Sequence, residues 1–340
     1  MRNLRGFILL FLLCQLVSLC LVLVNAGEES SSSSPRTGSW QNCTSVATKL
    51  DDNINDHPDS GVTTISCNQI HYRIPKSSLQ KIDHEIVIGV LSGASTKGRR
   101  TSIRSTWAYR KKNVFFIVAG PWDEIKQEYD EFGDLLWINR EEVYVTETSV
   151  LTFKSESFFS IFYKIFMNDN HNNKIRYLLK TDDDSYIHYQ KLREAVIDSH
   201  DDNIDYWGKC HDEAWKPHRN HEVEWQKKWY ISYDVYPEPE YPPYCQGAGI
   251  LLSKTFLDCA IGNGHAARVR YMPNEDVAIG MLAERCGIPT TDDARVWVRW
   301  DEEDGITMDG KIIQHYVSTE NDMRLHHRSA TGVRGPILLQ

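Results

Sequence analysis

At residues 176–184 the chain reads RYLLKTDDD, an apolar run that leads directly into three consecutive aspartates. The apolar part predicts a buried strand, which places the aspartates at its end. Adjacent carboxylates repel one another unless a cation neutralises them, and their hard oxygen atoms suit Mg²⁺ or Mn²⁺. A metal ion held there can bind a diphosphate and stabilise its charge as it leaves. The alternative is a solvated acidic turn or a helix cap, but a strand that ends at the aspartates favours the metal site.

Further buried strands alternate with helices on both sides of this segment. Apolar runs and helix-start residues predict strands at 85–91, 114–119, 135–138 and 176–181, and helices at 101–109, 121–132, 149–168 and 191–199. This alternation is typical of an α/β fold in which a mostly parallel central sheet carries helices on both faces. Ligands of such sheets bind at the carboxyl ends of the strands, where the three aspartates are expected.

The bulk composition restricts the class of protein. With 340 residues, of which 41% are hydrophobic, the chain can form one large domain or two small ones with a sizeable core. The formal net charge is -9, and there is no long basic run. Nucleic acid is therefore not expected as a partner, because binding many phosphates needs a clustered positive surface.

The N-terminus carries an apolar run without charge, FILLFLLCQLVSLCLVLV at residues 7–24, after Arg2 and Arg5. This length is just sufficient to span a bilayer as a helix, and the basic flank is expected to remain in the cytosol. A cleaved signal peptide is the alternative, because residues 24–26 resemble a cleavage site. We favour a transmembrane signal-anchor, because the run exceeds the usual length of a signal core. In both cases the chain is expected to enter the secretory pathway.

Residues after the anchor agree with a luminal location. Segment 27–39 is rich in Ser and nearly without apolar residues, which indicates a flexible stem, and Asn42 begins a glycosylation sequon. Six cysteines lie outside the anchor: Cys43, Cys67, Cys210, Cys245, Cys259 and Cys286. Their even number suggests disulfides whose pairing stays open. We expect a cytosolic tail at 1–6, the anchor at 7–24, a luminal stem and lead-in at 25–82, and the folded domain at 83–340.

Three further motifs could supply residues of a functional site. RRTSIRSTW at 99–107 follows the first strand and opens a helix, where amides and Arg side chains suit a phosphate or nucleotide; ordinary surface arginines are the alternative. PNEDV at 273–277 places two acids before an apolar helix, which they could cap or equip with a general base. His315, in KIIQHYV, is structural unless it lies near the aspartates, where its imidazole could complete a metal shell.

These motifs, in this order, resemble those of glycosyltransferase family 31, the β-1,3-galactosyltransferase and β-1,3-N-acetylglucosaminyltransferase group with its fringe-like relatives. The most specific stretch is KWYISYDVYPEPEYPPYCQGAGILLS at 228–253, which is similar to the family's Lys-Trp-Tyr and Tyr-Pro-x-Tyr-Cys-x-Gly-x-Gly block. RTSIRSTW, LLKTDDD, NEDVAIG and KIIQHYVSTENDM resemble four other family motifs. The resemblance covers roughly residues 85–327.

The resemblance implies an anchored glycosyltransferase of the Golgi membrane. The expected fold is a single nucleotide-sugar-binding domain of the GT-A type, in single-pass type II orientation with the catalytic domain in the lumen. The expected reaction transfers a sugar, with inversion, from a UDP-sugar to a glycan acceptor on a glycoprotein or glycolipid, with Mn²⁺ as cofactor. Galactose transfer in β-1,3 linkage is favoured. A β-1,3-N-acetylglucosaminyltransferase and a non-catalytic glycan-binding protein are the alternatives, although the retained acids and His315 argue against the second.

Individual roles follow from the resemblance, motif by motif. The implied metal ligands are Asp182, Asp184 and His315. The implied general base is Asp276, and Glu275 is expected to bind substrate or orient the site. The donor side is expected to comprise Arg100, Arg104, Lys180, Asp182 and Asp183. The sugar pocket is expected to be shaped by Trp229, Tyr241, Tyr244 and Gly247, although the two tyrosines could simply pack.

The chain departs from the family pattern at two places. Ile250 stands where a Tyr usually follows the second Gly of the Tyr-Pro block. The family's Asp-x-Tyr-x-Asn-Leu-Thr segment is represented only by Tyr144 and, after a longer gap, by Leu151, Thr152 and Lys154. These changes leave the reaction class intact but leave the identity of the sugar and of the acceptor open.

Overall fold

The computed structural model describes residues 62–67, 70–79, 82, 84–144, 149–167, 174–199, 204–211, 213, 215–298 and 307–332. All of these belong to one compact unit. The expected anchor at 7–24, the Ser-rich segment and Asn42 lie outside the described residues. Among the described residues, no helix combines the length and the apolar character needed to cross a membrane.

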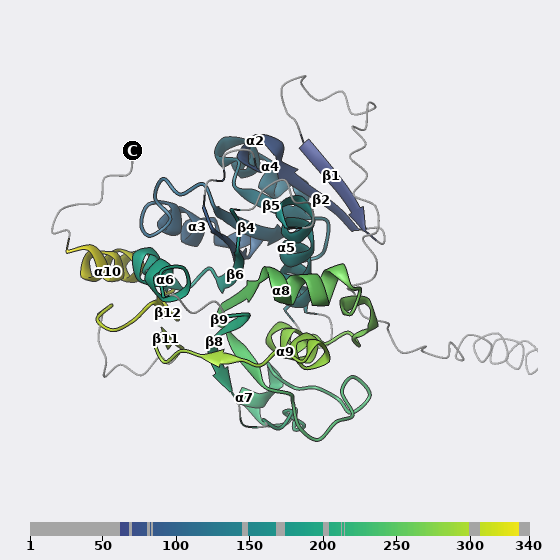
Figure 1. Cartoon of the computed structure of the whole chain (residues 1–340). Coiled ribbons are helices and arrows are strands. Elements are labelled where there is room, and N and C mark those ends of the chain that lie inside the picture. The colour runs from purple at the N-terminus through teal and green to yellow at the C-terminus, as the bar shows by residue number, and fades with distance from the viewer. Residues whose placement is uncertain are drawn as a thin grey trace, which may run out of the picture. The chain divides into compact units, whose positions relative to one another are not determined.

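A nine-stranded sheet, counted over the described residues, forms the centre of this unit, and Figure 1 shows it between layers of helices. The strand order is β1-β2-β5-β4-β3-β6-β9-β8-β10. The strands are β1 (Val62–Cys67), β2 (Ile70–Pro75), β3 (Ile86–Ser92), β4 (Val114–Ala119), β5 (Leu135–Ile138), β6 (Tyr177–Asp182), β8 (Tyr206–His211), β9 (Tyr244–Ser253) and β10 (Thr291–Asp292). A smaller sheet has the order β11-β12-β7 and consists of β11 (Val296–Trp297), β12 (Ile313–Gln314) and β7 (Tyr186–Ile187).

The central sheet is mixed rather than mostly parallel, which corrects the prediction. In the described part of the chain four neighbouring pairs are parallel, namely β4–β5, β3–β4, β3–β6 and β8–β10. Four others are antiparallel, namely β1–β2, β2–β5, β6–β9 and β8–β9. The parallel part is the one in which strands alternate with helices, because a crossover helix returns the chain in the same direction. β9 instead follows β8 as the return strand of a long hairpin, so it runs against both of its neighbours.

Helices cover both faces of the sheet. They are α2 (Lys76–Leu79), α3 (Lys97–Arg104), α4 (Trp122–Phe132), α5 (Val150–Phe166), α6 (Tyr189–Val196), α7 (Glu224–Lys227), α8 (Lys254–Leu257), α9 (Glu275–Cys286) and α10 (Glu320–Thr331). Alternate residues of β3 point to opposite faces, as expected for a strand buried on both sides. Val87 and Leu91 belong to the core under α5, α8 and α9. Ile88 and Val90 belong to the core under α3, α4, α6 and α10.

The element bounds agree closely with the sequence in the parallel part of the sheet. Strands β4 and β5 have the predicted bounds. Helix α3 begins earlier than predicted, at Lys97, and ends at Arg104, after which the chain forms turns. The sheet also extends further towards the N-terminus than expected, because β1 and β2 precede Asp83 and β2 pairs with β5. The lead-in therefore contributes to the folded unit.

Two disulfides lie within the described residues. Cys210 of β8 bonds Cys245 of β9, where the two strands pair. Cys259, in the π-helical turn after α8, bonds Cys286 at the end of α9. The first bond closes the base of residues 212–243, which we call the β8–β9 excursion, a long segment rich in aromatic residues that contains α7.

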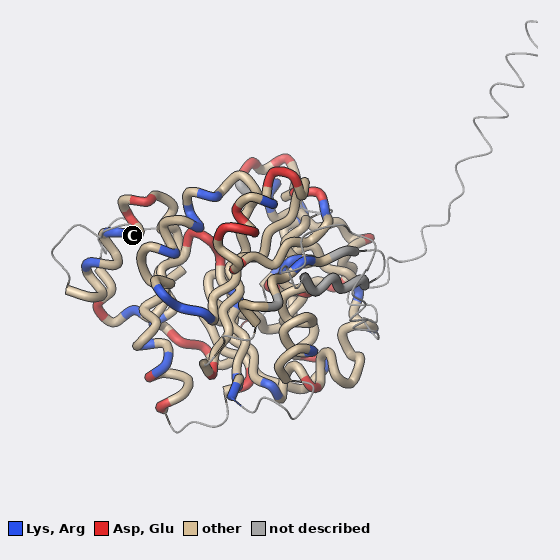
Figure 2. Tube along the Cα trace, turned by 90° about the horizontal axis from the view of Figure 1, so that it is seen from above, with Lys and Arg blue, Asp and Glu red and all other residues tan. Residues whose placement is uncertain are grey.

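Charged residues of both signs are interspersed along the described trace, as Figure 2 shows. Several exposed pairs lie one helical turn apart, such as Lys126 and Asp130 at 2.8 Å. Such pairs contribute only about 0.2–0.5 kcal/mol each. The charge clusters with large energetic consequences are instead the half-buried and buried ones at the carboxyl ends of β3 and β6.

Candidate active site

Three side chains converge at the carboxyl end of β6 and form a candidate metal site. Asp182 is the last residue of β6, Asp184 lies in the turn that follows, and His315 follows β12. The His315 Nε2 atom lies 3.1 Å from Asp184 Oδ1 and 3.6 Å from Asp182 Oδ2. One possible ligand atom from each residue lies within 4.8 Å of the others. The structure therefore brings together the three residues that the sequence indicated as metal ligands.

The small sheet brings His315 to the aspartates. β12 pairs with β7, so that Gln314 lies opposite Tyr186, two residues after Asp184. The N–H of Val317 then donates to the Asp184 carbonyl at 2.7 Å. Backbone hydrogen bonds on both sides of His315 thus fix its approach to the turn.

The donor set of this site fits a divalent cation. Two carboxylates and an imidazole suit Mn²⁺ and similar ions. Burial raises the pKa of Asp182, although the Lys180 ammonium opposes this effect. Burial would also raise the pKa of Asp184, but the hydrogen bond from His315 and the charges of His315 and Arg99 together outweigh it and hold that pKa below its ordinary value. A cation at this place would favour the ionised form of both carboxylates.

Asp183, between the two candidate ligands, points to the β3–α3 turn instead. Its Oδ2 accepts hydrogen bonds from Ser92 Oγ at 2.9 Å and from Thr96 Oγ1 at 2.6 Å. Its Oδ1 accepts from Arg99 at 2.8 Å. The side chain is nearly completely buried and serves to hold the turn against β6. Direct contact with donor sugar or ribose, as expected from the sequence, would compete with these three bonds.

Lys180 lies at the centre of a second acidic cluster, which adjoins the metal site. Its side chain is completely buried. The Nζ atom lies 2.9 Å from Asp182 Oδ1, 3.2 Å from Glu275 Oε1 and 3.9 Å from Asp276 Oδ1, and it donates to the Gly247 carbonyl at 2.9 Å. The ammonium is therefore shared among protein acceptors. Its position makes it a positioning residue that links Asp182 to the start of α9, rather than the direct donor contact that we predicted.

Asp276 is held by one carboxylate oxygen and presents the other without a partner. The Gly247 N–H donates to Oδ2 at 2.8 Å, whereas Oδ1 is buried without a hydrogen bond. Burial raises the pKa of this carboxyl well above its ordinary range, and the neighbouring Glu275 carboxylate adds to the effect. A buried acceptor without a partner is unusual in folded proteins and marks a place where a substrate group can bind.

The helix-cap alternative for Asp276 does not hold in the structure. The N-cap of α9 is Asn274, whose side-chain Oδ1 accepts from the Asp276 N–H at 3.2 Å. Asp276 is the second residue of the helix, so capping is already provided by its neighbour. The Asp276 carboxylate is therefore not needed to cap the helix.

Gly247 is required here because of a close approach. A Cβ atom at this position would lie 2.6 Å from Lys180 Nζ and 2.7 Å from Asp276 Oδ1. Both distances are shorter than any side chain tolerates. We predicted that Gly247 shapes a sugar pocket, and the structure shows the more direct role of letting β9 approach the acid cluster.

The two predicted donor-side arginines lie in a different network. Arg100 is buried, and its donors reach Glu128, the Ser92 hydroxyl and the carbonyls of Gly93 and Ala94. These five hydrogen bonds use every N–H group of the guanidinium. Arg104 likewise binds Glu128 and both carboxylate oxygens of Asp134. The prediction for Arg100 is therefore corrected, because its guanidinium has no N–H left for a phosphate. Arg104, which was also predicted to bind the donor, is paired with Glu128 and Asp134 instead.

Replacing Arg100 with Met is therefore expected to destabilise the protein and not to weaken donor binding specifically. Burial would raise the pKa of Glu128, but hydrogen bonds from Arg100 and Arg104 hold it low, so the carboxylate stays charged. Removing one partner of a buried ion pair costs about 3–5 kcal/mol. Urea denaturation measures this loss. Lys97→Met, an exposed position on the same helix, is the control. Unchanged stability with weakened UDP binding would restore the donor-side role.

The predicted sugar-pocket aromatics separate into packed and exposed residues. Tyr241 and Tyr244 are buried in a cluster with Ile231 and with Val277 of α9. Both tyrosines therefore pack in the interior, which is the alternative to a role in the sugar pocket. Trp229 lies in the β8–β9 excursion and is 40% exposed. No contact in the described residues connects it to the acid cluster.

Comparison with known proteins identifies the family. A sequence profile described as Galactosyltransferase matches residues 98–294, more than half of the chain. The chain belongs to the galactosyltransferase family. This membership confirms the resemblance to glycosyltransferase family 31, and the protein is a glycosyltransferase.

Curated relatives of this family are distant in sequence. Hydroxyproline O-galactosyltransferase GALT2 of Arabidopsis thaliana is 23% identical over 215 residues, which are 59% of this chain and 28% of the relative. Beta-1,3-galactosyltransferase GALT1 of the same plant is 26% identical over 258 residues, 71% of this chain and 36% of the relative. The chain thus spans about a third of the length of these relatives. The crystal structure of mouse xyloside xylosyltransferase 1, apo form, matches with 11% identity and a TM-score of 0.32, and covers 70% of this chain and 94% of the mouse chain.

Two features of this galactosyltransferase-family site were not among the predicted site residues. Arg99, rather than Arg100, faces the aspartates, at 2.8 Å from Asp183 and 3.9 Å from Asp184. Arg99 also lines a cavity of about 320 Å³ between the start of α3 and the segment after His315. The cavity is lined by Ser95, Thr96, Gly98, Arg99, Ser102, Val317, Ser318, Thr319, Glu320 and Met323. The second feature is Tyr144, which accepts a hydrogen bond from buried Lys154 beside this turn.

Proposed function

We propose that this galactosyltransferase-family protein transfers galactose from UDP-galactose to a glycan hydroxyl with inversion, forming a β-1,3 linkage. The observation that carries the proposal is the position of Lys180 between the candidate metal site and Asp276. The carboxylates of Asp182 and Asp184 suit a metal-bound diphosphate on one side. The unpartnered Asp276 Oδ1 suits an attacking hydroxyl on the other.

Asp276 supplies the base in this proposal. Its Oδ2 is fixed by the Gly247 amide, so that Oδ1 is oriented and can accept a hydrogen bond from the acceptor hydroxyl. As the acceptor oxygen attacks the anomeric carbon, its proton passes to Asp276 Oδ1. The sugar–phosphate bond breaks on the opposite face, which inverts the configuration. No protein nucleophile takes part, so no covalent sugar–enzyme intermediate forms.

The donor nucleotide is assigned to the cavity beside α3. A divalent cation bound by Asp182, Asp184 and His315 would neutralise the charge that develops on the leaving UDP. Arg99 lines the cavity and lies within 3.9 Å of Asp184, so a positive charge borders both the cavity and the metal site. Asp183 orients Arg99 and the β3–α3 turn rather than the substrate itself.

A donor and acceptor screen tests the proposed transfer. The purified protein is incubated with UDP-galactose, UDP-N-acetylglucosamine or UDP-N-acetylgalactosamine and a panel of oligosaccharide acceptors. A hydroxyproline peptide is included, because a curated relative is named for that acceptor. We expect most product from UDP-galactose, with a β-1,3 linkage by NMR. Preference for UDP-N-acetylglucosamine would select the alternative transferase, and the absence of turnover with every donor would reject the proposal.

We further propose that residues 7–24 anchor the protein in the Golgi membrane, with the enzyme domain in the lumen. The apolar run without charge supports this proposal. The disulfides of Cys210 with Cys245 and of Cys259 with Cys286 agree with it, because such bonds persist in oxidising compartments.

Luminal topology predicts an N-glycan at Asn42. Glycosidase treatment of the expressed protein should increase its gel mobility, and Asn42→Gln should remove this shift. Protease added to intact vesicles is expected to spare the chain after residue 30. Complete digestion of that part would place the enzyme domain in the cytosol and reverse the orientation.

A further inference from the structure

Trp215, in the β8–β9 excursion, is exposed although it is firmly held. Its ring lies against the His211 imidazole, with ring centroids 4.0 Å apart and an interplanar angle of 30°. Nevertheless, 43% of its surface remains open to solvent. The Trp215 carbonyl accepts a hydrogen bond from the Tyr241 N–H at 2.7 Å, which fixes the backbone beneath the ring.

The support under Trp215 comes from β8 and from β9, the strand whose Gly247 N–H binds the candidate base. The imidazole of His211, the last residue of β8, is hydrogen-bonded to the side chain of Gln246 on β9. The His211 ring also packs edge-on against Tyr244, at 5.6 Å between centroids. The Cys210–Cys245 disulfide joins the same two strands at this point. Trp215 thus contacts a side chain that is itself held between the ends of β8 and β9.

This arrangement is connected to the candidate base through β9. Gln246 immediately precedes Gly247, whose N–H binds Asp276. A hypothetical Cβ on Gly280, one helical turn after Asp276, would meet the Tyr244 side chain at 2.7 Å, so β9 and α9 run in close contact here. The donor cavity is instead lined by residues 95–102 and 317–323. Trp215 is therefore linked to Asp276 through β9 and does not belong to the lining of the donor cavity.

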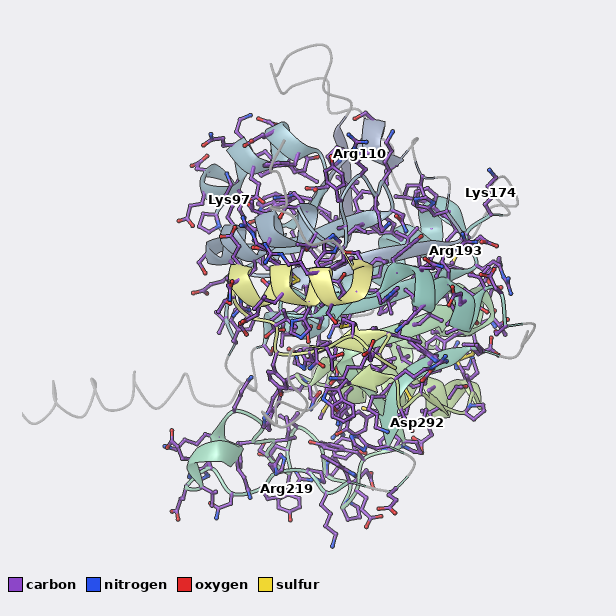
Figure 3. All side chains as sticks on the ribbon, turned by 90° about the vertical axis from the view of Figure 1, so that its left-hand side faces the viewer. Lys97, Arg110, Lys174, Arg193, Arg219 and Asp292 are labelled. Atoms are coloured by element: carbon purple, nitrogen blue, oxygen red, sulfur yellow. A yellow bond between two sulfur atoms is a disulfide. The ribbon has the colours of Figure 1, made fainter. Side chains whose placement is uncertain are left out.

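We propose that Trp215 is a stacking subsite for a sugar ring of the acceptor, next to the sugar whose hydroxyl reacts. The proposal rests on the proposed function, which supplies a glycan acceptor. An exposed indole offers a flat apolar face, and a pyranose has an apolar face of C–H groups that covers such a ring. Aromatic side chains with a few polar neighbours are the usual lining of sites for small ligands. Figure 3 shows the excursion around Arg219 at the lower end of the view, and its exposed aromatic residues are Trp215, Trp229 and Tyr233.

Polar groups around Trp215 suit a neutral sugar. Lys209 of β8 is paired with Asp292 at 2.9 Å, so its charge is compensated. Gln246 and His211 add hydrogen-bonding groups beside the ring. A proline-rich peptide could also stack on an exposed aromatic ring. The hydrogen-bonding side chains of Gln246 and His211 suit sugar hydroxyls and favour the sugar, and the peptide becomes an outcome of the test.

The test compares Trp215→Ala and Trp215→Phe with Tyr109→Ala. Tyr109 is similarly exposed, at 44%, and follows α3, outside the proposed subsite. Steady-state kinetics are measured with a disaccharide acceptor and with the corresponding monosaccharide glycoside. Trp215→Ala should raise the KM for the disaccharide about tenfold, the change that corresponds to roughly 1.4 kcal/mol of binding. Trp215→Phe should retain part of the affinity. The donor KM, the monosaccharide KM and the Tyr109→Ala kinetics should stay close to wild type.

Two results would overturn the subsite. One is an unchanged disaccharide KM in Trp215→Ala, and the other is a loss confined to a peptide acceptor. Saturation-transfer NMR of the disaccharide with wild type and Trp215→Ala, in the presence of UDP, gives a readout that needs no turnover. Equal binding to both would reject the subsite even if the wild type were inactive. Absence of UDP-sugar turnover in the wild type would count against the proposed function alone.

Discussion

Asp184→Ala and His315→Ala are each expected to weaken UDP and Mn²⁺ binding together and to reduce turnover at least about 100-fold. Each substitution removes one side chain from the same candidate ion site, where Nε2 and Oδ1 lie 3.1 Å apart. The charge of a leaving diphosphate has few other partners here, and a metal ion supplies several kcal/mol of stabilisation to such a charge. A loss of about 1.36 kcal/mol of transition-state stabilisation lowers the rate tenfold.

Calorimetry of UDP binding with and without Mn²⁺ measures the coupled loss. EDTA should abolish turnover of the wild type, and Mn²⁺ should restore it best among divalent ions. Asp130→Ala is the control, because Asp130 forms an exposed pair on α4 whose loss costs only a few tenths of a kcal/mol. Full activity in EDTA would reject the metal assignment. Wild-type UDP affinity in both variants would make His315 a structural residue.

The position of the candidate metal ligands could be predicted from the sequence to a large extent. The buried strand before DDD predicts that the aspartates lie at the carboxyl end of β6, and the structure has them there. His315 was included only through the order of motifs, because nothing in its neighbourhood predicts the antiparallel pairing of β12 with β7. Two-residue strands carry too weak a pattern for any sequence argument to find them.

The arginines show where the sequence interpretation went wrong, and the reason lies in helical spacing. Arg100 and Ile103 lie three residues apart in α3 and are both buried. This spacing places Arg100 on the apolar face of α3. Arg99 lies off that face and remains partly exposed, where it reaches Asp183. A charged residue on the buried stripe of a helix is better interpreted as half of an ion pair than as a ligand for substrate.

The direction of the strands in the C-terminal half could not be predicted. YWGKCH at 206–211 and YCQGAGILLS at 244–253 carry glycines and polar residues, which weaken the pattern of a strand. The long excursion between them also gives no indication in the sequence that the two strands pair. The glycine in this part of β9 has a structural cause. Gly247 stands where β9 must approach Lys180 and Asp276 closely, so the sequence that weakens the strand pattern is the one that builds the site.

Asp276→Asn is expected to lower kcat by roughly 10²- to 10⁴-fold, the scale of a positioned acid–base group. Asparagine keeps the size of the side chain and can still accept the hydrogen bond from the Gly247 amide, but it cannot take up a proton. UDP and Mn²⁺ affinity should stay close to wild type, in contrast to Asp184→Ala. The melting temperature should be unchanged or higher, because the substitution removes a buried carboxylate that burial and Glu275 destabilise.

The wild-type rate should also depend on pH through Asp276. Only the ionised carboxylate can act as base, so kcat/KM falls as the pH is lowered through its pKa. Because burial and then Glu275 raise that pKa, the fall should occur at a higher pH than for an ordinary aspartate. This acidic limb should be missing from the residual activity of Asp276→Asn.

Asn274→Ala provides the reciprocal control for Asp276→Asn. Asn274 caps α9, so its loss should cost about 1 kcal/mol of stability and leave turnover of the folded protein nearly intact. Melting temperature, donor affinity and kcat measured on the same preparations of both variants separate a base from a cap. A kcat within a few-fold of wild type in Asp276→Asn would remove Asp276 from the mechanism. Glu275, whose Oε1 lies 3.2 Å from Lys180, would then be the next carboxylate to test, because it is the other acid that α9 brings to this cluster.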